Sequence, residues 1–260
     1  MKAKETVKII EEFCPESLAY DWDNVGLLVG DGEKEVKTVF VTLDTNLTTV
    51  KEAISKNADM IVSHHPILLG GIKRIDYNTA EGQMIKLLIE NNIPVFAAHT
   101  NMDTAKGGIN DKLAEMFSLT DVEILEQHTP NPNAGLGRIG KLKSPVKFSE
   151  FSKMCSEILN TPVRAAGDED KIITTIAVAG GSCSEVIPLA KEKGADAIVT
   201  GDLKYHNTMD MTYLDICIVD AGHYPTEICV MDIFEDILKN TGVDIIKSEN
   251  KDIFKFVNIL

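Results

Sequence analysis

The chain carries the same strand–helix–strand pattern twice, and this repeat limits its fold more than any other feature. Residues 38–65 align without a gap with residues 175–202, a displacement of 137 positions. In the two copies, Asp59 and Asp196 stand just before the second apolar run, and a hydroxyl residue ends that run. The same order of elements, with polar residues at the same positions, indicates two related units.

The likeness continues beyond these segments. In each copy a further apolar run leads to a histidine, His99 or His223, and a carboxylate follows four residues later, Asp103 or Glu227. Helical spacing and another strand-like run come next in both copies. The helices are expected at 108–117 and 226–239, and the strands at 122–125 and 243–246.

Alternating strands and helices predict an α/β protein with mostly parallel sheets and right-handed crossovers. We expect two similar α/β domains related by the repeat. Residues 1–125 form the first unit and residues 126–260 the second, while the segment of about 240–260 fits either unit.

Three further elements are expected outside the repeat. Residues 4–13 have the pattern of an amphipathic helix, and residues 148–159 have helical spacing with Ser149 as a suitable cap. Residues 252–260 are apolar enough to form a packed terminal strand.

Composition excludes several classes of partner. The formal net charge is −14 over 260 residues, so the chain as a whole repels nucleic acid and anionic membranes. No apolar run approaches the length of a membrane span. The five cysteines are widely spaced and form no CxxC pair, which favours a reducing compartment and argues against a thiolate zinc site. We therefore expect a cytoplasmic protein.

Five of the six histidines lie in four short stretches, each at the end of an apolar run. Imidazoles and carboxylates at strand ends are the groups that a divalent-metal centre needs. The stretches are Ser63-His64-His65-Pro66, Ala98-His99-Thr100-Asn101-Met102-Asp103, Gly201-Asp202-Leu203-Lys204-Tyr205-His206 and Gly222-His223-Tyr224-Pro225-Thr226-Glu227.

Taken singly, these signals fit ordinary structure as well as metal binding. Neighbouring residues of a strand point to opposite faces, so His64 and His65 can serve neighbouring ions only where the chain turns at a strand end. A carboxylate such as Asp103 or Glu227 near a helix N-terminus is also a common cap or ion-pair partner. Together the stretches predict a metal centre in a cleft between the two halves. Nitrogen and oxygen ligands suit Zn, Fe, Mn, Co or Ni without choosing among them.

The same motifs, joined by Asp21-Trp22-Asp23-Asn24-Val25-Gly26-Leu27, resemble those of the Nif-three-like family, also called the GTP cyclohydrolase I type 2 family. The resemblance spans essentially the whole chain, in family order, and matches the short form without a central insertion. It implies two similar α/β domains, a ring-shaped homohexamer and two divalent metal ions per chain. The implied ligands are His64, His65, Asp103, His223 and Glu227, with Glu227 as the bridge. His99 is implied near the metals, where we assign it a supporting or proton-transfer role.

Three functions are compatible with this sequence. The first is a metal-dependent hydrolase of GTP cyclohydrolase I type 2 kind, acting on a nucleotide-like substrate through a metal-bridging hydroxide. Only three arginines are present, so an arginine clamp for a triphosphate is not evident. The alternatives are a non-catalytic metal storage or delivery protein and a regulatory interaction scaffold.

Several remaining residues have two readings. Asp202 and His206 either line the cleft or hydrogen-bond their own loop. The Gly180-Gly181-Ser182 turn either holds an anion or is simply a tight turn, which is the favoured reading. Trp22, the only tryptophan, either stacks on a base or packs. Cys183 is expected to be a buried thiol.

Overall fold

The computed structural model describes residues 1–249 and 251–256, which form two compact units. Unit 1 consists of Met1–Ala105 and Val230–Lys251, and unit 2 consists of Lys106–Cys229 and the segment that begins at Asp252. Residues 106–125 thus belong to unit 2, and the stretch from Val230 returns to unit 1.

The sheet of unit 1 has five strands in the order β1-β4-β3-β2-β11. All neighbouring pairs are parallel except β1 with β4. The strands are β1 (Gly26–Val29), β2 (Thr38–Asp44), β3 (Met60–His65), β4 (Val95–Ala97) and β11 (Asp244–Lys247). The helices are α1 (Ala3–Phe13), η1 (Glu16–Leu18), α2 (Leu47–Ser55), α3 (Ala80–Glu90), α4 (Thr100–Thr104) and α10 (Val230–Leu238).

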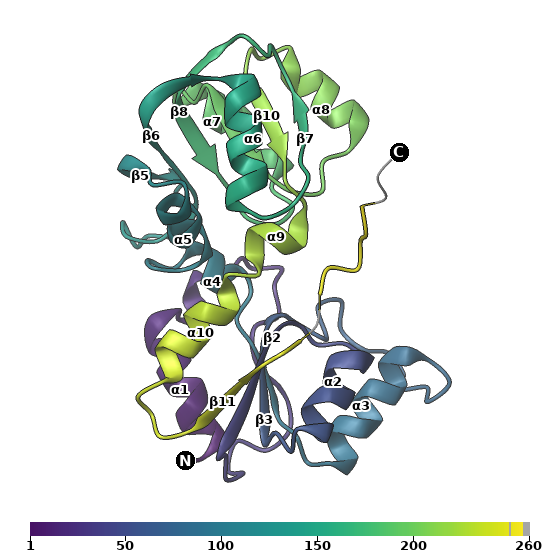
Figure 1. Ribbon diagram of the computed structural model, residues 1–260. Helices are drawn as coiled ribbons and strands as arrows, with labels where there is room; N and C mark the ends of the chain where they lie inside the picture. Colours follow the sequence, from purple (N-terminus) through teal and green to yellow (C-terminus); the bar gives the residue numbers. More distant parts are fainter. Residues whose placement is uncertain (250, 257–260) are drawn as a thin grey trace. The chain divides into compact units, whose positions relative to one another are not determined.

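Both faces of this sheet are covered. Helices α2 and α3 lie on one face, and α1 and α10 lie on the other (Figure 1). Phe40, Ile61 and Val95 pack with α2 and α3 in one core cluster, while the alternate residues Val39 and Val62 are fully buried as well. Because both faces are covered, each central strand has a continuous apolar run, Val39–Val41 in β2 and Met60–Val62 in β3, rather than an alternating pattern.

The sheet of unit 2 has six strands in the order β5-β6-β8-β9-β10-β7. Helices α6 and α7 cover its two faces (Figure 1). The strands are β5 (Thr120–Glu126), β6 (Leu136–Lys147), β7 (Arg164–Ala166), β8 (Ile172–Val178), β9 (Ala197–Thr200) and β10 (Cys217–Asp220). The helices are α5 (Ile109–Met116), α6 (Phe148–Ile158), η2 (Ser184–Val186), α7 (Ile187–Glu192), α8 (Tyr205–Thr212) and α9 (His223–Glu227).

The internal repeat is present in the hydrogen bonding of each unit. The Asp59 carboxylate accepts from the backbone N–H groups of Lys37 and Thr38, at 2.8 and 3.0 Å. The Asp196 carboxylate accepts from the N–H groups 137 positions further on, those of Thr174 and Thr175, at 2.8 and 2.9 Å. In both copies the aspartate therefore holds the start of the first strand beside the start of the second.

The same parallel core stands at the centre of each sheet. Strands β2, β3 and β4 in unit 1 correspond to β8, β9 and β10 in unit 2, and an antiparallel edge strand lies beside the last of each three. Each unit therefore has an α/β fold with a mixed sheet.

The expectation of mostly parallel sheets is wrong for unit 2. Only β8–β9 and β9–β10 are parallel, whereas β5–β6, β6–β8 and β7–β10 are antiparallel. The reason is the hairpin of β5 and β6, which adds two strands to the edge without a crossover helix.

Two expected elements also differ. The helix expected at 226–239 is two helices, α9 in unit 2 and α10 in unit 1. Thr226 is held in unit 2 by the N–H of Gly181, whereas Val230 and Phe234 pack in unit 1, so the helix is interrupted between them. Ser149 is not the cap of α6, because Lys147 holds that position.

The terminal strand expected at 252–260 is not seen among the described residues 252–256, whose apolar side chains Ile253 and Phe254 are exposed. Residues 257–260 lie outside the described part. No helix in the described ranges is long and apolar enough to cross a membrane.

The paired aspartates give a test of the repeat. We expect Asp59→Ala and Asp196→Ala each to lower the free energy of unfolding by about 1–3 kcal/mol, because two backbone N–H groups lose a charged acceptor. Urea denaturation followed by circular dichroism measures this. Asp170→Ala, which removes only an exposed ion pair with Lys147, is the control and should change stability little. Unchanged stability in both variants would contradict the structural role of these carboxylates.

Candidate metal centre

In unit 1, three histidines gather where β3 and β4 end. His64 and His65 are the last residues of β3, and His99 directly precedes α4. The ring centroid of His64 lies 4.9 Å from that of His65 and 5.2 Å from that of His99. One ring nitrogen of each histidine lies within 4.8 Å of the other two, a spacing that suits metal ligands.

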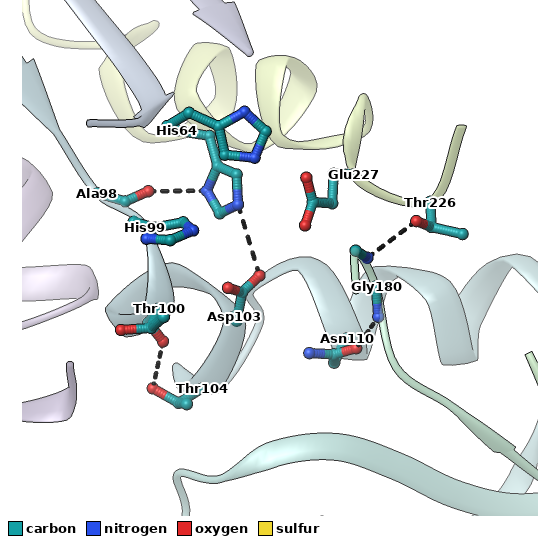
Figure 2. A network of polar contacts seen from close by, with 12 residues as sticks. His64, Ala98, His99, Thr100, Asp103, Thr104, Asn110, Gly180, Thr226 and Glu227 are labelled. Atoms are coloured by element: carbon teal, nitrogen blue, oxygen red, sulfur yellow. Dashed lines mark hydrogen bonds and ion pairs between the residues drawn. The ribbon is translucent and has the colours of Figure 1, made fainter. Parts of the chain in front are cut away.

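His64 is fully buried and its ring is fixed by the backbone. Its Nδ1–H donates to the carbonyl oxygen of Ala98 at 2.8 Å, and its Nε2 lies 3.7 Å from Oδ1 of Asp103 (Figure 2). Asp103 is also buried, in the first turn of α4. The hydrogen bond at Nδ1 fixes the tautomer, so Nε2 is the nitrogen that carries the lone pair toward a cation.

His65 is fixed by a carboxylate of the neighbouring strand. Its Nδ1 donates to Oδ1 of Asp44 at 2.7 Å, and Asp44 is the register partner of His65 in the parallel pair β2–β3. The register of the β2–β3 pair therefore places the Asp44 carboxylate where it orients the His65 ring.

His99 is fixed by a buried aspartate from the loop before β1. Its Nδ1 donates to Oδ1 of Asp23 at 2.9 Å, and Thr100 donates to the other carboxylate oxygen through both its N–H and its hydroxyl. Burial alone would raise the pKa of Asp23, but the hydrogen bonds from His99 and Thr100 outweigh it and lower that pKa to about 2. Asp23 is therefore ionised at neutral pH and holds the His99 ring in place.

Unit 2 supplies a second imidazole–carboxylate pair. His223 and Glu227 are the first and last residues of α9, and Nε2 of His223 lies 2.9 Å from Oε2 of Glu227. The Nδ1 of His223 donates to Asp202 at 2.8 Å. Asp202 thus orients the histidine of the second copy, as Asp44 orients His65 in the first.

The glycine turn of unit 2 makes room for Glu227. The N–H of Gly180 donates to Oδ1 of Asn110, and the N–H of Gly181 donates to Oγ1 of Thr226 (Figure 2). Both groups are occupied by protein oxygens, which agrees with a tight turn. Gly181 has a φ of +70°, and a Cβ there would stand 2.1 Å from Oε1 of Glu227. A side chain at this position is therefore incompatible with the observed carboxylate.

Four histidines share one arrangement, in which Nδ1 bonds to a backbone carbonyl or a carboxylate, so Nε2 is the ring nitrogen suited to coordination. In His64 and His223 this nitrogen faces the carboxylate of Asp103 or Glu227. This is the usual arrangement around protein-bound metals, where the outer hydrogen bond sets the ring orientation and raises basicity. The described donors are imidazole nitrogens and carboxylate oxygens. The five cysteines are buried, and burial raises the pKa of Cys14 to about 12, which disfavours thiolate ligation there. The residues therefore fit a divalent ion of the Zn, Fe, Mn, Co or Ni group.

The predicted site residues fall into two groups. His64, His65, Asp103 and His99 come together in unit 1, and His223 and Glu227 come together in unit 2. His206 is exposed on α8, with its ring against Tyr205, and takes no part in either group. Cys183 is buried and donates to the carbonyl of Gly180.

Sequence reasoning missed the orienting carboxylates Asp44 and Asp23. Asp44 ends the strand that precedes the histidine strand, so the position was detectable once parallel pairing was assumed. Asp23 lies in the Asp-Trp-Asp-Asn motif, but its partner His99 is 76 residues away, and no local pattern joins them.

Comparison with known proteins identifies the family. The model of the family described as Duf34/NIF3 (NGG1p interacting factor 3) matches residues 1–253. The chain belongs to the DUF34/NIF3 family. A relative in Clostridium acetobutylicum, named GTP cyclohydrolase 1 type 2 homolog, is 37% identical over 98% of this chain and 99% of its own length.

Solved structures of this family have the same fold. A Bacillus cereus protein related to NIF3 superimposes with a TM-score of 0.91 at 26% identity, covering 99% of both chains. Reduced HcgD from Methanocaldococcus jannaschii superimposes with a TM-score of 0.83 at 33% identity, covering 96% of this chain and 98% of that one. The DUF34/NIF3 fold therefore covers nearly all of this chain, including the histidine group of unit 1 and the His223–Glu227 pair of unit 2.

The contact between Gly181 and Glu227 gives a test of the unit 2 pair. We expect Gly181→Ala to weaken binding of a divalent ion at least tenfold, because the new Cβ displaces the Glu227 carboxylate. Calorimetric titration of the metal-free protein with Zn²⁺ or Mn²⁺ measures the affinity.

Gly194→Ala is the matched control. Gly194 also has a positive φ, +87°, but a Cβ there meets nothing within 4 Å. This variant carries the backbone strain without the clash and should bind metal as the wild type does. Equal affinities in both variants would contradict the role of Gly181.

Proposed function

We propose that the protein binds two divalent metal ions per chain in a dinuclear centre that serves a hydrolytic reaction. The proposed ligands are three histidines and two carboxylates: His64, His65, Asp103, His223 and Glu227. The observation that supports the proposal is the shared use of Nδ1 as the anchoring nitrogen, which makes Nε2 the nitrogen of these histidines that would bind a metal.

Neither unit offers enough ligands for two ions alone. A catalytic divalent metal takes about three protein ligands and a water molecule. Unit 2 contributes one imidazole and one carboxylate, whereas unit 1 contributes the histidine group and Asp103. We propose that the two sets serve one centre, with Glu227 as the bridging carboxylate, because a bridging anion offsets the repulsion of two cations about 3.5–4 Å apart.

Two bound divalent ions would supply Lewis acidity and lower the pKa of a water molecule toward neutrality. The protein supplies the remaining functions. Asp103 and Glu227 are buried carboxyl groups that would balance the positive charge of bound ions. We propose that His99, which ionised Asp23 holds beside His64 and His65, accepts or returns a proton at Nε2.

We propose a nucleotide-like substrate, and the support is the name of the relatives, GTP cyclohydrolase 1 type 2 homolog. The arginines do not form a triphosphate clamp. Arg138 is buried and paired with Asp111, Arg164 is paired with Asp220, and Arg74 is exposed. We therefore expect contacts with the base to contribute more to substrate binding than contacts with a phosphate chain. A cytoplasmic location agrees with the buried thiols.

Elemental analysis of the purified, metal-replete protein tests the centre. We expect two metal ions per chain in the wild type and a sharp fall in the Glu227→Ala and His64→Ala variants, because each removes a buried ligand. His206→Ala, which removes an exposed histidine outside both groups, is the control and should keep both ions. A wild-type content near zero would contradict the proposal.

The hydrolytic step has its own test. Metal-loaded wild type should convert a member of a nucleotide panel, and Glu227→Ala should lose at least 100-fold in kcat/KM while remaining folded. If the loaded protein converts no member of the panel but passes its metal rapidly to an apo-enzyme, the storage or delivery alternative is correct. If the metal-free protein binds a protein partner with unchanged affinity, the scaffold alternative is favoured.

We also propose that six chains assemble into a ring, and helix α8 supports a contact between copies. None of the residues of α8 is buried, and Tyr205, Met209 and the residue that follows the helix, Tyr213, are exposed. Light scattering should give the mass of six chains for the wild type and a smaller mass for the Met209→Glu/Tyr213→Glu double variant. Ile253→Glu, an exposed apolar position outside α8, is the control. A monomeric wild type would contradict the assembly.

A further inference from the structure

The only tryptophan of the chain is exposed next to the histidine group of unit 1. Trp22 is 61% exposed although it is the largest apolar side chain in the sequence. An indole that stays in water loses the favourable free energy of burial, roughly 25 cal/mol for each Å² of apolar surface. Such a side chain is typical of a surface that receives a ligand.

The loop that carries Trp22 is rigidly held despite this exposure. The Asp23 carboxylate is fully buried and accepts from the N–H and hydroxyl of Thr100 at 3.0 and 2.5 Å. On the other side, the N–H of Tyr20 donates to Oγ1 of Thr100, and the side-chain amide of Asn24 donates to the carbonyl of Leu68. The indole therefore stands on a fixed support, which reduces the conformational entropy that a ligand would have to freeze.

The indole also belongs to a row of rings that leads to the candidate ligands. Tyr20 stacks on it, with centroids 6.0 Å apart and an interplanar angle of 19°, and His99 meets it edge-on at 6.0 Å. His99 in turn lies 5.2 Å from His64 and 5.6 Å from His65. A flat ring that stacks on Trp22 would therefore lie beside the group that we propose to hold metal.

We propose that Trp22 is a stacking platform for the flat heterocyclic ring of the substrate, a purine or pyrimidine base. This inference rests on the proposed function, because it names the part of the nucleotide-like substrate that unit 1 recognises. Stacking accepts every base, since each has a π-face, so the platform positions the ring without choosing among bases. Trp22 is a binding residue in this account, and the metal ligands do not depend on it.

Because Trp22 is the only tryptophan, its fluorescence reports on this one site. We expect adenosine, guanosine and cytidine to quench the emission saturably in the metal-free protein as well as the metal-loaded protein. Ribose 5-phosphate, which has no base, should leave the emission unchanged. Equilibrium dialysis with the same nucleosides gives the affinity independently of the fluorophore.

Variants separate stacking from general damage. Trp22→Ala should weaken nucleoside binding about tenfold, and Trp22→Phe should weaken it less because it keeps a ring. Tyr77→Ala is the matched control, since Tyr77 is a similarly exposed aromatic residue of unit 1, at 57%. Its affinity should equal that of the wild type. All three variants should keep the wild-type metal content.

Three results would overturn the platform. They are the absence of saturable quenching, equal nucleoside affinity in wild type and Trp22→Ala, and emission that changes with protein concentration instead of nucleoside, which would mean that a second copy covers the indole. Failure of the proposed function is distinguishable. Nucleoside binding without turnover would support the role of Trp22 and contradict the proposed hydrolase activity. Turnover of a substrate that has no aromatic ring would contradict the role of Trp22 alone.

Discussion

The hydrogen bonds at Nδ1 of the histidines are the interactions on which the rest of the site depends. A histidine can present either ring nitrogen, and the choice is made by what the other nitrogen bonds. Here the backbone carbonyl of Ala98 fixes His64, and the carboxylates of Asp44 and Asp202 fix His65 and His223. Each of these acceptors stands at or just beyond the end of a sheet strand, so the register of the sheets determines where the Nε2 atoms that we propose as metal ligands point.

The two copies of the repeat differ in which positions carry candidate ligands and which carry orienting groups. The positions 137 residues after His64 and His65 are Gly201 and Asp202. A Cβ at Gly201 would lie 2.6 Å from the backbone of Gly222, so the second copy has no room for a histidine there. Asp202 has become the acceptor that holds His223.

The reverse exchange occurs at Asp44. Its counterpart is Gly181, whose missing side chain leaves space for Glu227. The corresponding sheet edges therefore differ: that of unit 1 is rich in histidine, and that of unit 2 leaves space for the Glu227 carboxylate. The first copy has three oriented histidines, His64, His65 and His99, whereas His223 is the oriented histidine of the second.

The sequence was sufficient for features that depend on local pattern. Apolar runs and the repeated aspartates predicted the central parallel strands of both sheets, and the histidine motifs identified the residues that gather at the strand ends. The sequence was insufficient for features that are determined by packing between segments far apart in the chain. The β5–β6 hairpin, the break between α9 and α10, and the pairing of His99 with Asp23 each depend on contacts that no local spacing encodes. Asp44 lies between these cases, because its role follows from strand register.

Nitrogen-15 NMR of histidine-labelled protein during titration with Zn²⁺ tests the central claim most directly, because it distinguishes the two ring nitrogens. The account predicts that Nε2 of His64, His65 and His223 shifts on metal binding, while the Nδ1 protons of these rings persist and remain hydrogen-bonded. Coordination through Nδ1, or loss of those protons in the metal-loaded protein, would contradict it.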